Sequence, residues 1–337
     1  MRTALREARR GLGLTSPNPA VGAVLTAGEK IIGRAFHERA GGPHAEIKCL
    51  EQVAGPLPKD ATLYVTLEPC STAGQTGPCT DAIVRAGVGT VVVGAIDVNP
   101  RHNGRGIATL RKAGIEVRSG VLSEECSDLN ESFNKWILTG QPFVIAKCGM
   151  SLDGRLTRPP REPRWITNAR ARRDAQVLRS EVDAILIGAE TVRADNPRLT
   201  VRGIAGANQP WRVVLTRSES LPDGARLFRD RFKEKTIVYG KKSLPLVLRD
   251  LGKKSVTSVL IEGGGSILGE ALDAGLIDKV QIYLGPIFTG GPVIAFGGRG
   301  ASSTQTAVRL TRLSYAKLGD DVRVIGYPVY KSASAAE

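Results

Sequence analysis

His44, Glu46, Cys70 and Cys79 are the residues whose types and spacing best fit a chemical centre. One histidine nitrogen and two cysteine sulfurs are good zinc ligands, and three protein ligands leave a fourth coordination position for water. Zinc lowers the pKa of such a water toward neutrality, which makes hydroxide available as a nucleophile. Glu46, close to the ligand His44, is suited to carry a proton from that water to a leaving amine. The pattern predicts a hydrolytic zinc site of the deaminase type.

The spacing of the cysteines departs from the P-C-x-x-C pattern of many zinc deaminases, because Cys70 and Cys79 lie further apart. A structural zinc knuckle, or three unrelated buried residues, are the alternatives. A structural site normally has a fourth protein ligand, and the sequence offers no obvious one near these three. We therefore expect a catalytic zinc ion, about one per chain.

The composition narrows the class of protein. The 337 residues suggest two domains of about 150 residues each. The segment Met1–Glu7 has no apolar region of the kind found in secretory signals, and no apolar run approaches the roughly 20 residues of a membrane span. Five cysteines, an odd number, do not suggest a disulfide framework. We expect a cytoplasmic protein with no membrane partner.

The formal net charge of +14 favours an anionic partner. Nucleic acid is one candidate, because basic surfaces attract phosphates. However, aromatic residues make up only 5% of the chain, and no segment interleaves them with lysine and arginine as single-strand binders do. We favour small phosphorylated substrates and cofactors, and expect no nucleic-acid partner.

The first 140 residues alternate between helix-like and strand-like segments, which indicates a βαβ-type layered sheet. His44 and Glu46 would lie in the first turn of a helix and Cys79 at the start of another, with Cys70 after a strand. The expected helices cover residues 4–12, 44–53 and 79–86, and the expected strands cover 20–25, 30–33, 61–66, 90–95 and 115–117.

A break near residues 139–142 divides the chain into domains 1–141 and 142–330, and we expect the small, polar tail 331–337 to be disordered. The second domain shows a further alternating series. Its expected helices are 168–179 and 267–274, and its expected strands are 143–146, 184–187, 212–215, 236–239, 258–261 and 279–284.

Two loops of the second domain are candidates for binding phosphate. Residues 258–261 lead through the glycine-rich turn 262–266 into a helix, and such a turn can present backbone N–H groups to phosphate. It lacks the complete G-x-G-x-x-G pattern, because Leu268 stands at the last glycine position, so a tight packing corner is an equal alternative. Residues 194–202 combine a carboxylate, an Asn-Pro turn and arginines in one loop.

Several motifs, in this order, resemble those of the bifunctional riboflavin-biosynthesis deaminase–reductases almost from end to end. In the first half they are Thr15-Ser16-Pro17-Asn18-Pro19, Gly41–Glu46 and Thr66-Leu67-Glu68-Pro69-Cys70. In the second half they are Ser151-Leu152-Asp153-Gly154-Arg155, Trp165-Ile166-Thr167, Ala194–Arg202 and Ile261-Glu262-Gly263-Gly264.

The resemblance implies an α/β protein with a cytidine-deaminase-like αβα domain followed by a dihydrofolate-reductase-like α/β domain. The first domain would hydrolyse the 2-amino group of a phosphoribosylamino-diaminopyrimidinone. The second would pass hydride from NADPH to ribose C1′, giving a ribityl side chain. The enzyme would therefore be multifunctional, both hydrolase and oxidoreductase, with a phosphoribosyl-aminopyrimidine as its substrate.

The resemblance also assigns residues by position. Glu46 would be catalytic, and Lys147 and Asp153 would line the reductase site. The cofactor contacts would be Gly149, Trp165, Thr191, Asp195 and the turn Gly264, Gly265, Ser266, Ile267, Leu268 and Gly269. The substrate contacts would be Asn18 in the first domain and Arg179, Leu199, Arg202 and Glu262 in the second.

Three positions depart from the family. Thr72 and Gln75 stand where the family usually has a histidine and then a lysine or arginine, and Pro163 stands where it usually has a serine. A lost charge-assisted contact would weaken the grip on the deaminase substrate by roughly 1.5–3 kcal/mol. Arg101, His102 or Arg105 is available to replace it.

Two other functions fit part of the sequence. The zinc motif alone would suit another nucleobase or nucleotide deaminase, including one acting on RNA, although the motifs of the second half argue against a stand-alone RNA editor. A basic nucleic-acid-binding protein with a vestigial deaminase domain would show salt-dependent binding and no ammonia release. We favour the bifunctional enzyme and expect it to be a homo-oligomer.

Overall fold

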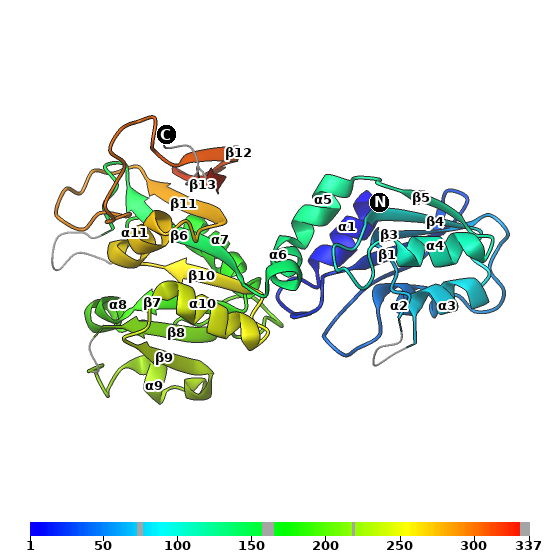
Figure 1. Cartoon of the computed structure of the whole chain (residues 1–337), viewed down its shortest axis with the longest axis horizontal. Helices are drawn as coiled ribbons and strands as arrows, with labels where there is room; N and C mark the ends of the chain where they lie inside the picture. Colours follow the sequence, from blue (N-terminus) through cyan, green and yellow to red (C-terminus); the bar gives the residue numbers. More distant parts are fainter. Residues whose placement is uncertain (73–76, 157–164, 218–219, 331–337) are drawn as a thin grey trace. The chain divides into compact units, whose positions relative to one another are not determined.

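Two separate β-sheets organise the chain, one in each of its compact units, Met1–Gln141 and Pro142–Glu337 (Figure 1). The computed structural model describes residues 1–72, 77–156, 165–217 and 220–330. The expected disorder of the tail 331–337 and the departures at Gln75 and Pro163 fall outside these residues. Among the described residues, no helix has both the length and the apolar character needed to cross a membrane.

The first unit contains a five-stranded sheet with the order β2-β1-β3-β4-β5. β1 pairs antiparallel with β2 and β3, whereas β3, β4 and β5 are parallel to one another. Its elements are α1 (Arg2–Arg9), β1 (Gly22–Ala27), β2 (Lys30–Phe36), α2 (Ala45–Leu50), β3 (Ala61–Leu67), α3 (Cys79–Arg85), β4 (Thr90–Ala95), α4 (Arg105–Lys112), β5 (Glu116–Ser119), α5 (Ser123–Leu129) and α6 (Glu131–Thr139).

Helices pack on the strands of this sheet through two hydrophobic clusters. Ala45 of α2, Ile83 of α3 and Leu110 of α4 share one core with strands β1, β3 and β4. Leu5 of α1 and Cys126 of α5 belong to a smaller cluster at the ends of β3 and β4. α2 and α3 are therefore held against the sheet, and both begin at the expected zinc ligands.

The second unit contains an eight-stranded sheet with the order β12-β13-β11-β6-β10-β7-β8-β9. The strands from β11 to β9 in that order are parallel, whereas β13 and β12 continue the sheet antiparallel. Its strands are β6 (Phe143–Ser151), β7 (Ala184–Gly188), β8 (Trp211–Thr216), β9 (Thr236–Gly240), β10 (Ser258–Glu262), β11 (Lys279–Gly285), β12 (Arg309–Leu318) and β13 (Asp321–Val329), and its helices are α7 (Ala169–Ser180), α8 (Ala189–Asp195), α9 (Arg226–Arg229), η1 (Lys233–Lys235), α10 (Leu244–Lys253) and α11 (Gly265–Asp273).

The central strands of this sheet are almost continuously buried. β10 has the sequence SVLIE, and all of its residues are buried; such apolar runs are typical of parallel strands covered on both faces. Because β6, β10, β7 and β8 are parallel, their carboxyl ends meet at one edge of the sheet, which is where ligands bind in open α/β sheets. Both units are mixed α/β, as the alternating pattern predicts.

Several elements were not expected from the sequence. β12 and β13 carry mixed polar and apolar residues and are partly exposed, so they lack the buried runs of the central strands. α10 is amphipathic and contains a proline in its first turn, a position that a helix tolerates. Most of the expected strands and helices agree with the structure to within three residues at each end. The exception is the expected strand 143–146, because β6 continues to Ser151.

Candidate active sites

His44, Cys70 and Cys79 come together in the first unit. Their possible ligand atoms all lie within 4.8 Å of one another. Nδ1 of His44 is 3.1 Å from Sγ of Cys79 and 3.6 Å from Sγ of Cys70. His44 caps the N-terminus of α2, and Cys79 is the first residue of α3. One nitrogen and two sulfurs that converge in this way fit a zinc ion with one further position open.

Glu46 lies in the first turn of α2, next to this cluster, with only 3% of its surface exposed. Burial raises the pKa of its carboxyl group. The hydrogen bond with Cys79 and the charge of His44 lower the pKa of the Cys70 thiol to about 4, so Cys70 is a ready thiolate ligand. A buried carboxyl group beside a metal centre is suited to both accepting and donating a proton.

Glu68 fixes the loop that carries Cys70. Its side chain is buried and accepts four backbone N–H bonds: Oε2 from Asp97 (3.3 Å) and Gly104 (2.8 Å), and Oε1 from Gly106 (2.8 Å) and Ile107 (3.2 Å). A side chain at Gly106 would come within 2.0 Å of the carbonyl oxygen of Pro69. The cysteine loop and the start of α4 are therefore held together by one carboxylate.

His37 is a site residue that the sequence analysis did not single out. Its Nε2 is 3.2 Å from Nδ2 of Asn18, its Nδ1 is 3.1 Å from the carbonyl oxygen of Pro43, and its ring meets that of His44 edge-on at 5.2 Å. His37 therefore connects Asn18, which is expected to contact the pyrimidine, to His44 of the metal cluster. A signal was available, because all three histidines of the chain lie within its first 102 residues.

The loop that follows β4 approaches the same cluster. Burial raises the pKa of Asp97, and the charges of Glu68 and Cys70 act in the same direction, whereas that of His102 opposes it. The backbone N–H of Asp97 also donates to Glu68, at 3.3 Å, which joins this loop to the residue that fixes the loop of Cys70. Nδ1 of His102 is buried and has no hydrogen-bond partner among the described residues. Thr72 is exposed.

The second unit places a buried ion pair at the carboxyl edge of its sheet. The guanidinium of Arg179 on α7 binds both carboxylate oxygens of Glu262, with Nε 2.9 Å from Oε1. Burial alone would raise the pKa of Glu262, but the charges of Arg179, Lys147 and Arg202 outweigh it and hold that pKa at about 2. Lys147 is opposite Glu262 in the β6–β10 register. The structure brings all four predicted residues together.

The glycines of the glycine-rich turn and of the helix that follows it are required for two different reasons. Gly263 and Gly264 adopt φ values of +83° and +72°, which favour glycine. Gly265 and Gly269 are required by packing instead, because a Cβ atom on them would come within 1.9 Å of the carbonyl oxygen of Ile294 and 2.4 Å of Gly297. In the rest of the turn, Ser266 is exposed, whereas Ile267 and Leu268 are buried in the core.

The other expected cofactor residues lie near this edge. A Cβ atom on Gly264 would fill the space beside Oγ1 of Thr191, at 3.5 Å. Gly149, on β6, would in the same way meet Thr167 at 3.4 Å. The ring of Trp165 is 54% exposed and stacks with the guanidinium of Arg172 at 4.9 Å. Gly264 and Gly149 thus place no side chain beside Thr191 and Thr167, and the indole of Trp165 is accessible to a ligand.

Three further predicted residues differ in their surroundings. Asp195 ends α8 and is exposed. Leu199 is buried and has a φ of +51°, so it offers its backbone rather than its side chain. The carboxylate of Asp153 accepts hydrogen bonds from Ser151 and from the backbone of Thr289 and Gly290, and its pKa falls to about 2. Asp153 is thus occupied in fixing a turn.

Comparison with protein families gives matches in both units. The cytidine and deoxycytidylate deaminase zinc-binding region matches residues 1–95. The RibD C-terminal domain matches residues 142–324.

Relatives match over nearly the whole chain. The riboflavin biosynthesis protein RibD of Synechocystis is 41% identical, over 97% of this chain and 95% of its own. The solved structure of Acinetobacter baumannii RibD superposes with a TM-score of 0.89 at 36% identity, over 97% of each chain. A Thermotoga maritima diaminohydroxyphosphoribosylaminopyrimidine deaminase/5-amino-6-(5-phosphoribosylamino)uracil reductase has a TM-score of 0.87 at 34% identity, over 98% of this chain and 97% of its own.

Proposed function

The chain belongs to the family of bifunctional riboflavin-biosynthesis deaminase–reductases, and from that premise we propose how its residues divide the two reactions. It is a deaminase and a reductase of riboflavin biosynthesis that uses zinc and NADPH. We assign deamination to residues 1–141 and reduction to residues 142–330. The two substrates would be the diaminopyrimidinone phosphoriboside and its deaminated product.

The first unit would hold zinc through Nδ1 of His44 and the sulfurs of Cys70 and Cys79, whose convergence within 4.8 Å supports this ligand set. Bound zinc supplies a water molecule whose pKa is lowered toward neutrality. Glu46 would accept the proton of that water and pass it to the departing amine as ammonia is released. Burial favours the protonated form of Glu46, which suits the second half of this transfer.

Asn18 and His37 would orient the pyrimidine in the first unit. Their side chains are 3.2 Å apart, and His37 is buried beside His44. A substrate amide or ring nitrogen could take the place of this mutual contact, because both side chains carry donor and acceptor atoms. The loop bearing Arg101, His102 and Arg105 would supply the cationic contact that Thr72 does not.

The second unit would bind the deaminated substrate against Arg179, Glu262, Arg202 and the backbone at Leu199. Glu262 remains ionised, since the surrounding cations hold its pKa at about 2, so it can accept hydrogen bonds from hydroxyl or amino groups of the substrate. Trp165, Gly149, Thr191, Asp195 and the turn 264–269 would hold NADPH, which supplies the hydride. The role of these protein groups is placement and charge.

The single observation that carries the proposal is the convergence of His44, Cys70 and Cys79 beside buried Glu46. The test is to incubate the chain with the diaminopyrimidine phosphoriboside and NADPH and to follow products by mass spectrometry. Deamination should give a product about one mass unit heavier, because oxygen replaces NH. Reduction should add about two further units. Absence of the first shift with zinc-loaded protein would contradict the deaminase assignment, and absence of the second with authentic deaminated substrate would contradict the reductase assignment.

We also propose that the protein is a cytoplasmic homo-oligomer without nucleic-acid partners. Sedimentation of the purified chain would give its oligomeric state, and cell fractionation its location. Binding to DNA or RNA that weakens steeply with salt would contradict the last part of the proposal.

A further inference from the structure

A network of polar side chains joins α7 to β11 and β13 in the second unit. The hydroxyl group of Tyr283 donates to Oδ2 of Asp174 at 2.8 Å and accepts from Nε2 of Gln281 at 2.6 Å. Arg323 donates to both oxygens of the same carboxylate, at 2.8 and 2.9 Å. The function proposed above uses none of these four residues.

The network fixes the position of the Tyr283 ring. The side chain of Tyr283 is only 1% exposed, and it packs against Ala171 and Ala175 of α7. Its hydroxyl group is used both as a donor and as an acceptor. Displacement of the ring would break both hydrogen bonds where water does not replace them, which is costly in a protein interior.

The face of this ring receives Lys147. Nζ of Lys147, on β6, is 5.7 Å from the centroid of the Tyr283 ring, within the range of a cation–π contact. Gly149 is opposite Tyr283 in the β6–β11 register and has no side chain to fill the position beside the ring. The lysine side chain can therefore lean along β6 toward the ring.

Lys147 also belongs to the site of the buried ion pair. It is opposite Glu262 in the β6–β10 register and opposite Gln281 in the β6–β11 register. Burial raises the pKa of Glu262, but the charges of Arg179 and then Lys147 outweigh it and hold that pKa at about 2. Arg179 lies on α7, the helix that also packs against Tyr283. The ammonium group of Lys147 is thus located between a carboxylate and an aromatic ring, both covered by one helix.

We propose that Tyr283 is a positioning residue of the reductase site: its ring holds the ammonium group of Lys147 beside Glu262, facing the substrate. The inference rests on the proposed function. Lysine has a long, flexible stem and loses rotamer freedom when one position is selected. The ring binds a cation without carrying a charge, so it fixes Lys147 without competing with Glu262 for an ion pair. The charge of Lys147 therefore stays available to Glu262 and to the substrate.

The experiment separates positioning from stability through the coupling between two side chains. Tyr283→Leu, Lys147→Met and the double variant are compared in the full chain by NADPH oxidation with the deaminated substrate. We expect Tyr283→Leu to lower kcat/KM for that substrate about tenfold, the loss of one enclosed cation–π contact, with the KM for NADPH within about twofold of the wild type. In the Lys147→Met background the same substitution should lower kcat/KM less than about twofold, because no ammonium group remains to be positioned.

Two further variants are controls. Tyr283→Phe keeps the face of the ring and loses only the hydroxyl group, so kcat/KM should stay within about threefold of the wild type. Tyr327→Leu removes a half-buried ring of β13 that contacts Lys279 and Arg312 instead, and should change kcat/KM less than about twofold. Deamination should be unaffected in every variant.

The position of Lys147 can also be measured without turnover. Protons that lie over the face of an aromatic ring are shifted upfield in the NMR spectrum. The ε-methylene signal of Lys147, assigned by its absence in Lys147→Met, should be shifted in this way in the wild type and in Tyr283→Phe. In Tyr283→Leu it should move to the position of a solvated lysine.

Three outcomes would overturn the inference: equal losses from Tyr283→Leu in the wild-type and Lys147→Met backgrounds, a rise in the KM for NADPH as the main effect, or a Lys147 signal that does not depend on Tyr283. If Tyr283→Leu does not fold, the wild type and Tyr283→Phe decide, because absence of the upfield shift in either would contradict the contact. If the wild type oxidised no NADPH with authentic deaminated substrate while the Lys147 signal depended on Tyr283, the proposed function would fail, whereas the placement of Lys147 by Tyr283 would stand.

Discussion

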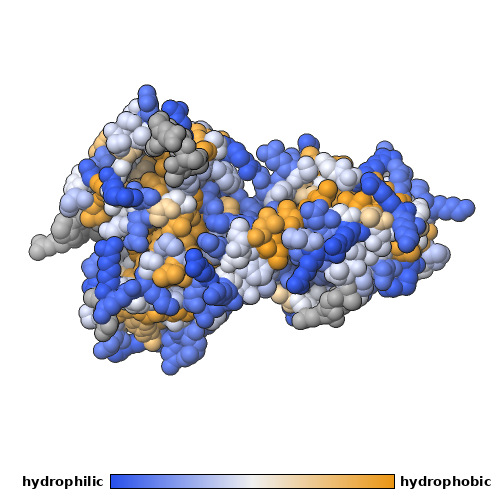
Figure 2. Space-filling view, in the orientation of Figure 1, coloured by the Kyte–Doolittle hydropathy of each residue, from blue (hydrophilic) through white to orange (hydrophobic). Residues whose placement is uncertain are grey.

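In the first unit, the groups expected to do chemistry are mostly shielded and lie in contact with one another, whereas those of the second unit are strung along the carboxyl edge of a sheet. Figure 2 shows polar and apolar side chains intermixed over the surface of both units. His44, Cys70, Cys79 and Glu46 form one cluster supported by Glu68. In the second unit the pair Arg179–Glu262 is comparably enclosed, whereas Arg202 and Asp195 are exposed.

The difference teaches what each site depends on. A compact cluster of ligands and a proton carrier loses its function when a single side chain changes, because every member acts on the same reacting atoms. A site spread over several loops divides its binding energy among many contacts. Its most sensitive contact is then the one whose charged groups stay buried, out of reach of water, when their partner is removed. In the second unit that contact is the buried ion pair.

The largest effect should come from Glu46→Gln. The amide keeps the size of the side chain but cannot carry a proton, so deamination should fall by about 10³-fold or more. Zinc content, measured by atomic absorption, should stay near one per chain. Reduction of the deaminated substrate by the same preparation is the control and should be unaffected. Deamination at the wild-type rate would remove Glu46 from the mechanism.

The second prediction concerns the buried pair of the other unit. Arg179→Met leaves Glu262 buried without its partner, which should lower the free energy of unfolding of this unit by about 3–5 kcal/mol. Urea unfolding followed by tryptophan fluorescence would measure it. Arg217→Met is the matched control, because Arg217 is 90% exposed and pairs with Glu270 at the surface, at 3.4 Å. This variant should lose less than about 1 kcal/mol of stability. Equal losses of stability in the two variants would contradict the view that the buried ion pair is the most sensitive contact of the second unit.

The third prediction concerns pH. Glu262 has a folded pKa of about 2, below its ordinary value of 4.5, so the fold favours its carboxylate. The resulting stabilisation, up to about 3 kcal/mol, is present above pH 4.5 and is lost as the pH falls through 2. Acid titration of the unfolding free energy should therefore show a shallower fall below pH 4.5 in Glu262→Gln than in the wild type. Parallel curves would show that Glu262 does not contribute.

The smallest effect expected is that of Glu68→Gln. The amide has one acceptor oxygen for backbone N–H groups that the carboxylate binds with two, so the first unit should lose about 1–3 kcal/mol of stability. Deamination should fall while reduction is unchanged. Glu38→Gln is the control, since Glu38 is 54% exposed and pairs only at the surface with Lys48. If Glu38→Gln weakened the unit as much as Glu68→Gln, the anchoring role of Glu68 would be excluded.

The two sites also differ in how far the sequence predicts them. The zinc cluster follows from short motifs, because residue type and spacing alone identify ligands that a turn and a helix start bring together. His37 was missed because it stands by itself at the end of β2, and only the fold places it against His44. The roles of the individual residues in catalysis and binding stay predictions.

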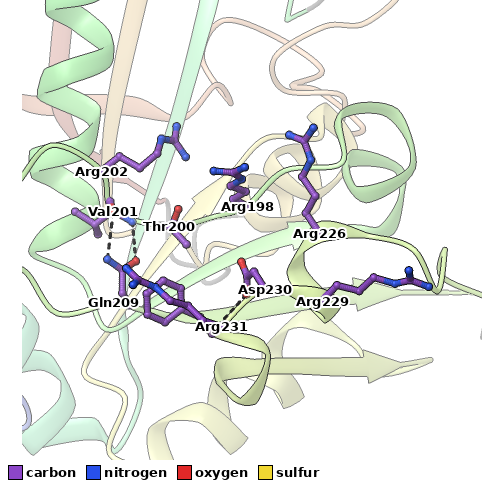
Figure 3. A pocket seen from close by; sticks show the side chains of 10 residues that line it. Arg198, Thr200, Val201, Arg202, Gln209, Arg226, Arg229, Asp230 and Arg231 are labelled. Carbon is purple, nitrogen blue, oxygen red and sulfur yellow. Dashed lines mark hydrogen bonds between the residues drawn. The ribbon is translucent and has the colours of Figure 1, made fainter.

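In the second unit the sequence predicts the central strands but not the surface that they create. Buried apolar runs such as that of β10 can be recognised in the sequence as strands. The partly exposed β12 and β13 lack the regular apolar pattern that would distinguish them from loops. Five arginines that line one open hollow of this unit, Arg198, Arg202, Arg226, Arg229 and Arg231, have no common motif (Figure 3). They meet because Arg212 joins the loop that follows α8 to α9, a long-range contact that spacing does not reveal.

The four backbone bonds accepted by Glu68 have a consequence for metal loading. They order the cysteine loop and the start of α4 through protein contacts alone. In small zinc domains much of the metal's binding energy is consumed in folding the ligands around it. Here the hydrogen bonds to Glu68 order the ligand loop, so zinc binding does not have to supply that free energy. Zinc exchange should therefore resemble the filling of a rigid chelator, with chelation emptying the site while the first unit stays folded.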